Sequence, residues 1–305
     1  MKNAVSGPLI SATYNPSMRI MAATASLALA LWPGALAWAD GTALPGTRPL
    51  GTGGAMRAAA TGDAGPMLNP SGISLVRAYT AEGAYQYGSR DSTHDARVSV
   101  VDSTSGLNLG GALFYDFHAA SPGGVSQTGH LVGGSLSFPL GDLLFIGVTG
   151  KYLHYSTTKG FTVDAGLTLR PVQFLSLAAV GYNLTNPGGS AAPQAVGGGA
   201  CLSPVPGLLL LVDSVLERIS KDAANPQETR SSVYYVMGGG EYQAKTMAAR
   251  LGGGRDGLHQ NDYLSGGFSF VSGIGALDAS LRQDISGGRK GTFVGVSLRL
   301  FVPAP

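Results

Sequence analysis

The sequence lacks the residues that most catalytic and metal sites need. Cys201 is the single cysteine, which excludes an internal disulfide and a cysteine-based metal site. The five histidines are scattered without a His-x-x-x-His spacing, and there is no Gly-x-Ser-x-Gly motif to mark a serine nucleophile. We therefore expect no enzymatic activity, no metal and no cofactor.

Charge and long apolar runs are also scarce. Asp, Glu, Lys and Arg make up 12% of the chain, about half of the quarter that is typical of soluble proteins. The formal net charge is only +2, which indicates no nucleic-acid partner. After Trp38 the longest aliphatic stretch is 208–212, far shorter than the roughly 20 residues of a membrane helix. The chain is then either soluble outside the cytoplasm or spans a membrane as a closed β-barrel, which satisfies its backbone groups internally.

The N-terminus predicts export. An apolar stretch, residues 20–36, follows Arg19 and leads to an Ala-x-Ala cleavage site before Asp40. A basic residue, a short apolar region and this ending are typical of a secretory signal peptide. We predict a signal peptide over residues 1–39, with Met18 as an alternative start of translation. A membrane anchor is the other interpretation, but a proline interrupts the apolar region.

Period-two alternation dominates the rest of the chain. In residues 292–301, TFVGVSLRLF, valine and leucine occupy every second position from 294 onward, with Gly, Ser and Arg between them. Residues 131–140, 161–170 and 276–284 alternate in the same way. Repeats of about ten residues, separated by turn residues, are typical of outer-membrane barrels. We count about fourteen such segments and predict an all-β fold, a transmembrane antiparallel β-barrel over residues 75–305.

A soluble β-sandwich also has alternating strands, but three observations favour the barrel. Tyrosines gather near strand ends, where the aromatic girdles of a membrane barrel lie. The charges are too few for a solvated surface of this size. The chain also finishes on an alternating strand with Phe301 near its end.

A glycine- and alanine-rich stretch precedes the first predicted strand. Residues 51–73, GTGGAMRAAATGDAGPMLNPSGI, resemble the pattern G-x-G-G-A-x-x-A-x-A-x-D-x-x-A-x-x-x-N-P-A-G-L. This pattern opens the mature region of the long-chain fatty-acid transporter (FadL-like) superfamily and of the related shuttle proteins of type IX secretion (PorV-like). Residues 180–187, VGYNLTNP, are similar to a mid-barrel stretch of the PorV-like branch. The resemblance implies a barrel of fourteen strands with an N-terminal hatch folded into it.

We predict that residues 40–74 form this hatch. Its glycines permit close packing of the backbone, Asp63 and Asn69 can bind their own neighbouring amides, and Pro70 stops a helix at Asn69. The hatch motif comprises Gly51, Gly53, Gly54, Asp63, Asn69, Pro70 and Gly72. An ordered arm that only caps one mouth of the barrel is the alternative.

The alternation also assigns residues to the lumen. If the valines and leucines of 292–301 face lipid, the residues between them face inward. The candidate lumen-facing charged residues are Glu82, Asp164, Arg170, Asp278, Arg282, Asp284 and Arg299. Structural ion pairing is the alternative to a ligand-binding role for them. Apolar residues are predicted to share the lumen, namely Phe114, Leu143, Phe145, Leu209 and Leu211.

A mixed lumen with a hatch favours an outer-membrane transporter or channel for hydrophobic small molecules. The alternative is a PorV-like component that does not transport, but binds secreted proteins or organises the envelope. We expect the protein in the outer membrane of a Gram-negative bacterium. Its expected partners are membrane lipid and lipopolysaccharide, the barrel assembly machinery and a hydrophobic small-molecule ligand.

Overall fold

The computed structural model describes residues 45–105, 109–121, 126–156, 158–185, 192–219, 231–288 and 290–302. The predicted signal peptide lies outside these ranges. Within them, no helix has the length and apolar character needed to cross a membrane.

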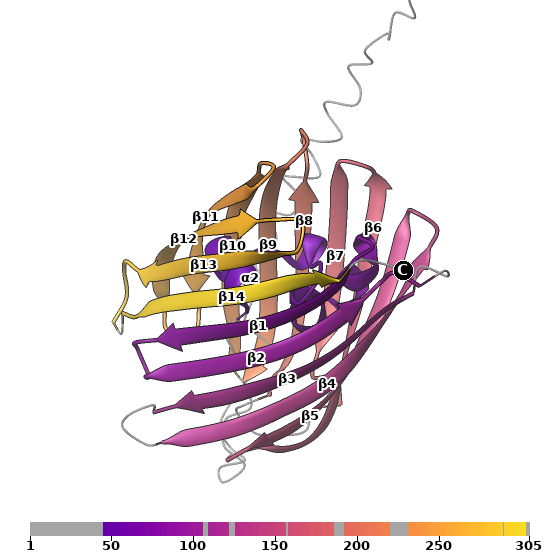
Figure 1. Ribbon diagram of the computed structural model, residues 1–305. Helices are drawn as coiled ribbons and strands as arrows, with labels where there is room; N and C mark the ends of the chain where they lie inside the picture. The colour runs from indigo at the N-terminus through magenta and orange to yellow at the C-terminus, as the bar shows by residue number, and fades with distance from the viewer. Residues whose placement is uncertain are drawn as a thin grey trace, which may run out of the picture. The chain divides into compact units, whose positions relative to one another are not determined.

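Fourteen antiparallel strands in the described ranges form one closed barrel, in which each strand pairs with the next and β14 pairs with β1 (Figure 1). The first seven are β1 Tyr79–Gly88, β2 Thr93–Asp102, β3 Gly110–Ala120, β4 Gln127–Leu140, β5 Leu144–Tyr155, β6 Lys159–Val172 and β7 Leu175–Tyr182. The others are β8 Gln194–Leu202, β9 Leu208–Ile219, β10 Ser231–Gln243, β11 Met247–Asp256, β12 Asn261–Val271, β13 Gly275–Asp284 and β14 Thr292–Val302. The predicted fold class is confirmed, although β1 begins at Tyr79 because a short helix extends to Leu75.

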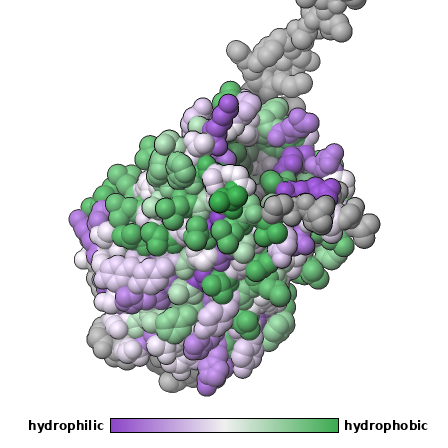
Figure 2. Space-filling view, in the orientation of Figure 1, coloured by the Kyte–Doolittle hydropathy of each residue, from purple (hydrophilic) through white to green (hydrophobic). Residues whose placement is uncertain are grey.

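The alternation of each strand separates an apolar outer face from a mostly polar inner face. In β14, Val294, Val296, Leu298 and Leu300 are exposed on the outside, whereas Ser297 is buried inside. Apolar side chains cover much of the side of the barrel seen in Figure 2. An outer surface of this kind is stable in contact with lipid acyl chains, so the barrel is suited to a membrane.

The connections differ between the two ends of the barrel. At the end where β1 starts and β14 finishes, most turns are short, such as 141–143 between β4 and β5 and 173–174 between β6 and β7. At the opposite end, the connections 183–193 and 220–230 are the longest. Outer-membrane barrels have short periplasmic turns and longer extracellular loops, so we take the end with the short turns as periplasmic.

The N-terminal segment lies inside the ring of strands (Figure 1). It comprises α2 Thr47–Gly51, η1 Arg57–Ala59, α3 Ala64–Leu68 and η2 Pro70–Leu75. Met56, Ala58 and Leu68 pack against inward side chains of the wall, including Tyr182 and Met237. The main apolar core is therefore the interface between this segment and the barrel. We call residues 47–75 the hatch.

Candidate functional site

Glycines in the wall make room for the hatch backbone. A Cβ atom added at Gly252 of β11 would lie 2.3 Å from the carbonyl carbon of Thr52, and one at Gly239 of β10 would lie 2.4 Å from the Thr52 oxygen. Opposite them, Gly53 has a φ of 71°, and its own added Cβ would lie 2.6 Å from the backbone nitrogen of Gly253. No side chain fits at these positions, so the hatch contacts the wall main chain to main chain.

The same arrangement recurs at the other side of the lumen. An added Cβ at Gly147 of β5 would lie 2.3 Å from the Pro70 carbonyl carbon, and one at Gly166 of β6 would lie 2.1 Å from Oδ1 of Asn69. At Gly197 of β8 the nearest atom is Nε of Arg57, at 2.9 Å. The hatch therefore spans the lumen between opposed walls instead of resting on one mouth.

A buried ion pair fixes the centre of the hatch. Nη1 of Arg57 lies 3.1 Å from Oδ2 of Asp213 on β9, and both side chains are almost fully buried. The same carboxylate oxygen accepts hydrogen bonds of 2.8 Å from the backbone nitrogens of Met56 and Arg57. Burial alone would lower the pKa of Arg57, but Tyr182 and Asp213 outweigh it and raise that pKa above its ordinary value. The guanidinium therefore stays charged inside the barrel.

The two stretches identified by resemblance meet at this point. Nε of Arg57 donates a 2.7 Å hydrogen bond to the hydroxyl of Tyr182, and that hydroxyl donates to the carbonyl of Leu68. Arg57 belongs to the hatch stretch 51–73, and Tyr182 belongs to the mid-barrel stretch 180–187. A single tyrosine thus joins two distant parts of the sequence at the hatch.

Asn69 anchors the end of the hatch. Its side-chain oxygen accepts hydrogen bonds from the backbone nitrogen of Ser71 at 3.2 Å and from its hydroxyl at 2.7 Å. Its side-chain nitrogen donates to the Arg57 carbonyl and to Oγ1 of Thr168 on β6, both at 2.9 Å. Asn69 therefore makes the turn with its own neighbours that the sequence predicts, and also binds the wall. Asp63 makes no such capping bond, although it is buried near Glu82.

An ion-pair network joins the hatch to the inner wall near the periplasmic end. Nε of Arg299 lies 2.7 Å from Glu82, and its Nη2 lies 3.2 Å from Asp278. Asp278 also contacts Arg250, whose Nε pairs with Glu241. From the hatch, Arg48 donates two hydrogen bonds, of 2.6 and 2.8 Å, to Glu241. Asp63 of the hatch lies beside Glu82 in the same network, which therefore joins three arginines to four acids.

The other predicted lumen residues lie elsewhere. Arg282 and Asp284 pair at 3.0 Å near the extracellular end, where Arg282 also contacts Asp256 at 3.2 Å. Asp164 pairs with Lys151 of β5 at 2.9 Å. The structure therefore divides the predicted charged set into separate ion-paired groups.

Arg170, another predicted lumen residue, lies at the periplasmic edge of the barrel. Arg170 is half-buried near the end of β6, with its guanidinium 5.3 Å from the centre of the Phe145 ring.

Most of the apolar residues predicted for the lumen lie on the inner face. Phe114, Phe145 and Leu211 are buried there, and Leu209 is half-buried. The prediction for Leu143 is wrong, because Leu143 lies in the β4–β5 turn with 52% of its surface exposed. A strand pattern extended one residue into a turn no longer fixes the direction of a side chain.

A cavity of about 290 Å³ lies between the hatch and the periplasmic end of the wall. Its polar lining includes Arg48, Arg250, Arg299 and Asp278 of the network, and its apolar lining includes Ile73, Val101 and Phe301. Among the described residues, no group of three or more His, Cys, Asp or Glu side chains could hold a metal ion.

Solved structures share this architecture. The monoaromatic hydrocarbon channel CymD aligns with a TM-score of 0.65 at 12% identity, over 87% of this chain and 99% of that one. The toluene transporter TodX of Pseudomonas putida aligns with a TM-score of 0.65 at 10% identity, over 87% of this chain and 98% of that one. A FadL homologue of Pseudomonas aeruginosa aligns with a TM-score of 0.58 at 12% identity, over 86% and 99%.

The fold is shared with these channels and transporters. The sequence matches no family model and no curated protein, so the likeness concerns the three-dimensional structure. The proteins named are channels and transporters, not enzymes.

Several residues that hold the hatch or pair along the inner wall were missed from the sequence, namely Arg48, Arg57, Lys151, Asp213, Glu241 and Arg250. A weak signal existed for two of them. Arg57 interrupts a run of small residues, and Asp213 directly follows the aliphatic stretch 208–212. Such lone charges are costly to bury without a partner, which indicates that each has one. The sequence spacing does not indicate which residue that partner is.

Proposed function

We propose that the protein is an outer-membrane channel for hydrophobic small molecules, in which the hatch obstructs the lumen. The observation that carries this proposal is the position of the hatch, held between opposed walls by the Arg57–Asp213 pair and by the wall glycines. The fold is shared with a monoaromatic hydrocarbon channel and a toluene transporter. Buried apolar side chains at Phe114, Phe145 and Leu211 give the lumen surfaces that an apolar solute prefers to water.

The proposal includes the route to the membrane. The signal peptide of residues 1–39 is removed after export, and the mature chain begins near Asp40. The protein then resides in the outer membrane of a Gram-negative bacterium. The assembly machinery inserts the barrel there among lipid and lipopolysaccharide.

Deletion of the hatch provides the test. In planar bilayers the intact protein should conduct little, and a variant lacking residues 51–72 should show a higher single-channel conductance. A heat-dependent shift in gel mobility checks that the variant barrel still folds. The proposal is rejected if intact and deleted proteins conduct alike.

Ligand binding provides a second test. An apolar solute such as toluene should raise the thermal unfolding temperature of the intact barrel, because a ligand that binds only the folded state stabilises it by mass action. The PorV-like alternative is favoured instead if toluene and long-chain fatty acids neither bind nor pass, while secreted proteins copurify with the barrel.

A further inference from the structure

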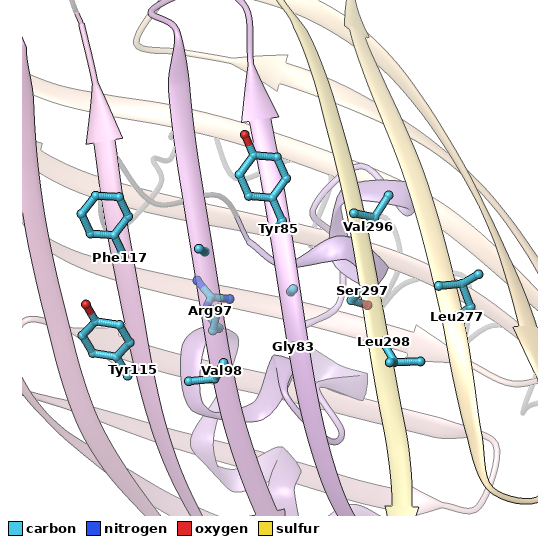
Figure 3. Close-up of a pocket in the computed structure, with 12 residues that line it drawn as sticks. Gly83, Tyr85, Arg97, Val98, Tyr115, Phe117, Leu277, Val296, Ser297 and Leu298 are labelled. Atoms are coloured by element: carbon cyan, nitrogen blue, oxygen red, sulfur yellow. The ribbon is translucent and has the colours of Figure 1, made fainter.

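A groove on the lipid-facing surface has no role in the proposed passage. Its volume is about 550 Å³ and its lining is almost entirely apolar (Figure 3), within the range of about 300–1,000 Å³ of ligand pockets. Tyr85, Val98, Tyr115, Phe117, Val296 and Leu298 surround it on strands β1, β2, β3 and β14. We call it the outer groove.

The groove exists because small residues replace large ones on the outer face. Gly83 of β1 and Ala96 of β2 both line it. Gly83 has no left-handed φ, and a Cβ added there would meet no atom within 4 Å. The backbone therefore does not require glycine at this position. What glycine provides is open space between Val98 and Leu298, its register partners on either side.

Polar side chains border the groove on its extracellular side. Tyr85 and His94 share a 2.6 Å hydrogen bond through Nδ1 of the histidine, and Tyr115 and His130 share one of 2.7 Å in the same way. Where the tyrosine hydroxyl donates to Nδ1, the imidazole proton lies on Nε2 and can be donated to an acceptor outside the barrel. Both distances fit either direction of donation.

The register extends this border from β4 across two more strands. His130 of β4 lies opposite His154 of β5, which lies opposite Lys159 of β6. All three are exposed, and directly opposed residues have Cβ atoms about 5 Å apart. We call His94, His130, His154 and Lys159 the polar row. The described acids within strands β1 to β6 either face inward, as Glu82, Asp95, Asp116 and Asp164 do, or lie at the periplasmic end, as Asp102 does. Asp91, in the extracellular turn before His94, pairs with Arg90.

We propose that the outer groove and the polar row together form a binding site for lipopolysaccharide. An acyl chain occupies the groove, and a phosphate of the lipid A headgroup accepts hydrogen bonds from the polar row. The charge of Lys159 and the imidazole rings complement an anion, and the groove complements a hydrocarbon chain. The groove lies below the His94 end of the row, and Lys159 on β6 lies three strands beyond the groove's edge at β3. The site lies toward the end with the longer loops and so faces the outer leaflet. This proposal rests on the placement of the barrel in the outer membrane and does not depend on solute passage.

Two pairs of variants test the two halves of the site. Gly83→Leu fills the groove, and Gly111→Leu is its control, because Gly111 also faces outward but lies near the periplasmic end of β3, with no atom closer than 3.9 Å to an added Cβ. The triple variant His130→Ala, His154→Ala and Lys159→Ala removes most of the polar row. Arg255→Ala is its control, because Arg255 is an exposed cation at the extracellular end of β11.

Native mass spectrometry of the purified barrels would compare retention of lipid A with retention of lipid A from which the phosphates have been removed. We expect Gly83→Leu to retain both lipids about tenfold less than Gly111→Leu does. We expect the triple variant to retain the phosphorylated lipid about tenfold less and the dephosphorylated lipid equally well. A tenfold loss is the effect expected from removing charge-assisted hydrogen bonds. Excess inorganic phosphate should leave the lipid bound, since it cannot fill the groove.

The proposal is overturned if wild type and the triple variant prefer phosphorylated lipid A equally, if inorganic phosphate displaces it, or if Gly83→Leu behaves as Gly111→Leu does. It is also overturned if Gly83→Leu abolishes uptake of an apolar solute, because the groove then belongs to the solute path. Heat-dependent gel mobility confirms that each variant is folded.

Discussion

The Arg57–Asp213 pair gives the sharpest test of how the hatch is held. In an Arg57→Met variant the side chain keeps similar length, but the Asp213 carboxylate loses its cation inside the barrel. Removing one partner of a buried ion pair costs about 3–5 kcal/mol. The backbone nitrogens of residues 56 and 57 still donate to Asp213, so we expect a loss near the lower limit. At about 1.4 kcal/mol per factor of ten, the population with the hatch released should rise about 100-fold.

Cysteine labelling measures that population. A cysteine at Ala59, in a Cys201→Ala background, reports release of the hatch through its rate of reaction with a bulky thiol reagent. The parent should react slowly and the Arg57→Met variant about 100-fold faster. In the double variant Arg57→Met, Asp213→Leu no unpaired charge remains, so labelling should slow again. The reasoning fails if Arg57→Met labels within about threefold of the parent, or if the double variant labels as fast as the single one.

Three further predictions concern the same interface and the barrel around it. Tyr182→Phe removes the hydroxyl that accepts from Arg57 and donates to Leu68, so it loses two buried hydrogen bonds. At a net of about 0.5–1.5 kcal/mol each, labelling at residue 59 should become at least about tenfold faster, and an unchanged rate would contradict that role. Gly252→Ala should release the hatch, because the added Cβ collides with the backbone of Thr52. Gly266→Ala is the control and should leave the labelling rate unchanged, because the nearest atom to its added Cβ is 3.6 Å away. Equal rates for the two variants would show that the close packing at Gly252 is unimportant. The mature protein should fractionate with the outer membrane and change its gel mobility on boiling, and a protein recovered soluble without such a change would exclude the membrane barrel.

The barrel was predictable because lipid imposes a simple rule on the sequence. Outward residues within the membrane must be apolar, and this rule holds for Leu277, Ala279 and Leu281 of β13 and for the outward residues of β14 from Val294 to Leu300. The same alternation predicted an inward direction for Glu82, whose surface is 6% exposed. The rule stops where a strand stops, as the outward Leu143 shows.

The partners inside the barrel were not predictable in this way. Arg57 and Asp213 are 156 residues apart, and no periodicity relates a hatch residue to a position on β9. The resemblance of residues 51–73 predicted a hatch, but not which wall it contacts. The glycine content was visible in the sequence, yet its purpose depends on which glycines face inward at the level of the hatch.

The main-chain contacts between hatch and wall have a consequence for how this sequence can diverge. Where the hatch backbone contacts glycines of the wall, as Thr52 contacts Gly239 and Gly252, the contact does not depend on the identity of most hatch side chains. Apart from the anchors Arg48, Arg57 and Asn69, hatch side chains can change while the path of the chain is preserved. A single Cβ gained on the wall blocks that path, and only a displaced hatch could accommodate it. Across homologues, the inward glycines of β5, β6, β10 and β11 should therefore vary less than the hatch that they accommodate.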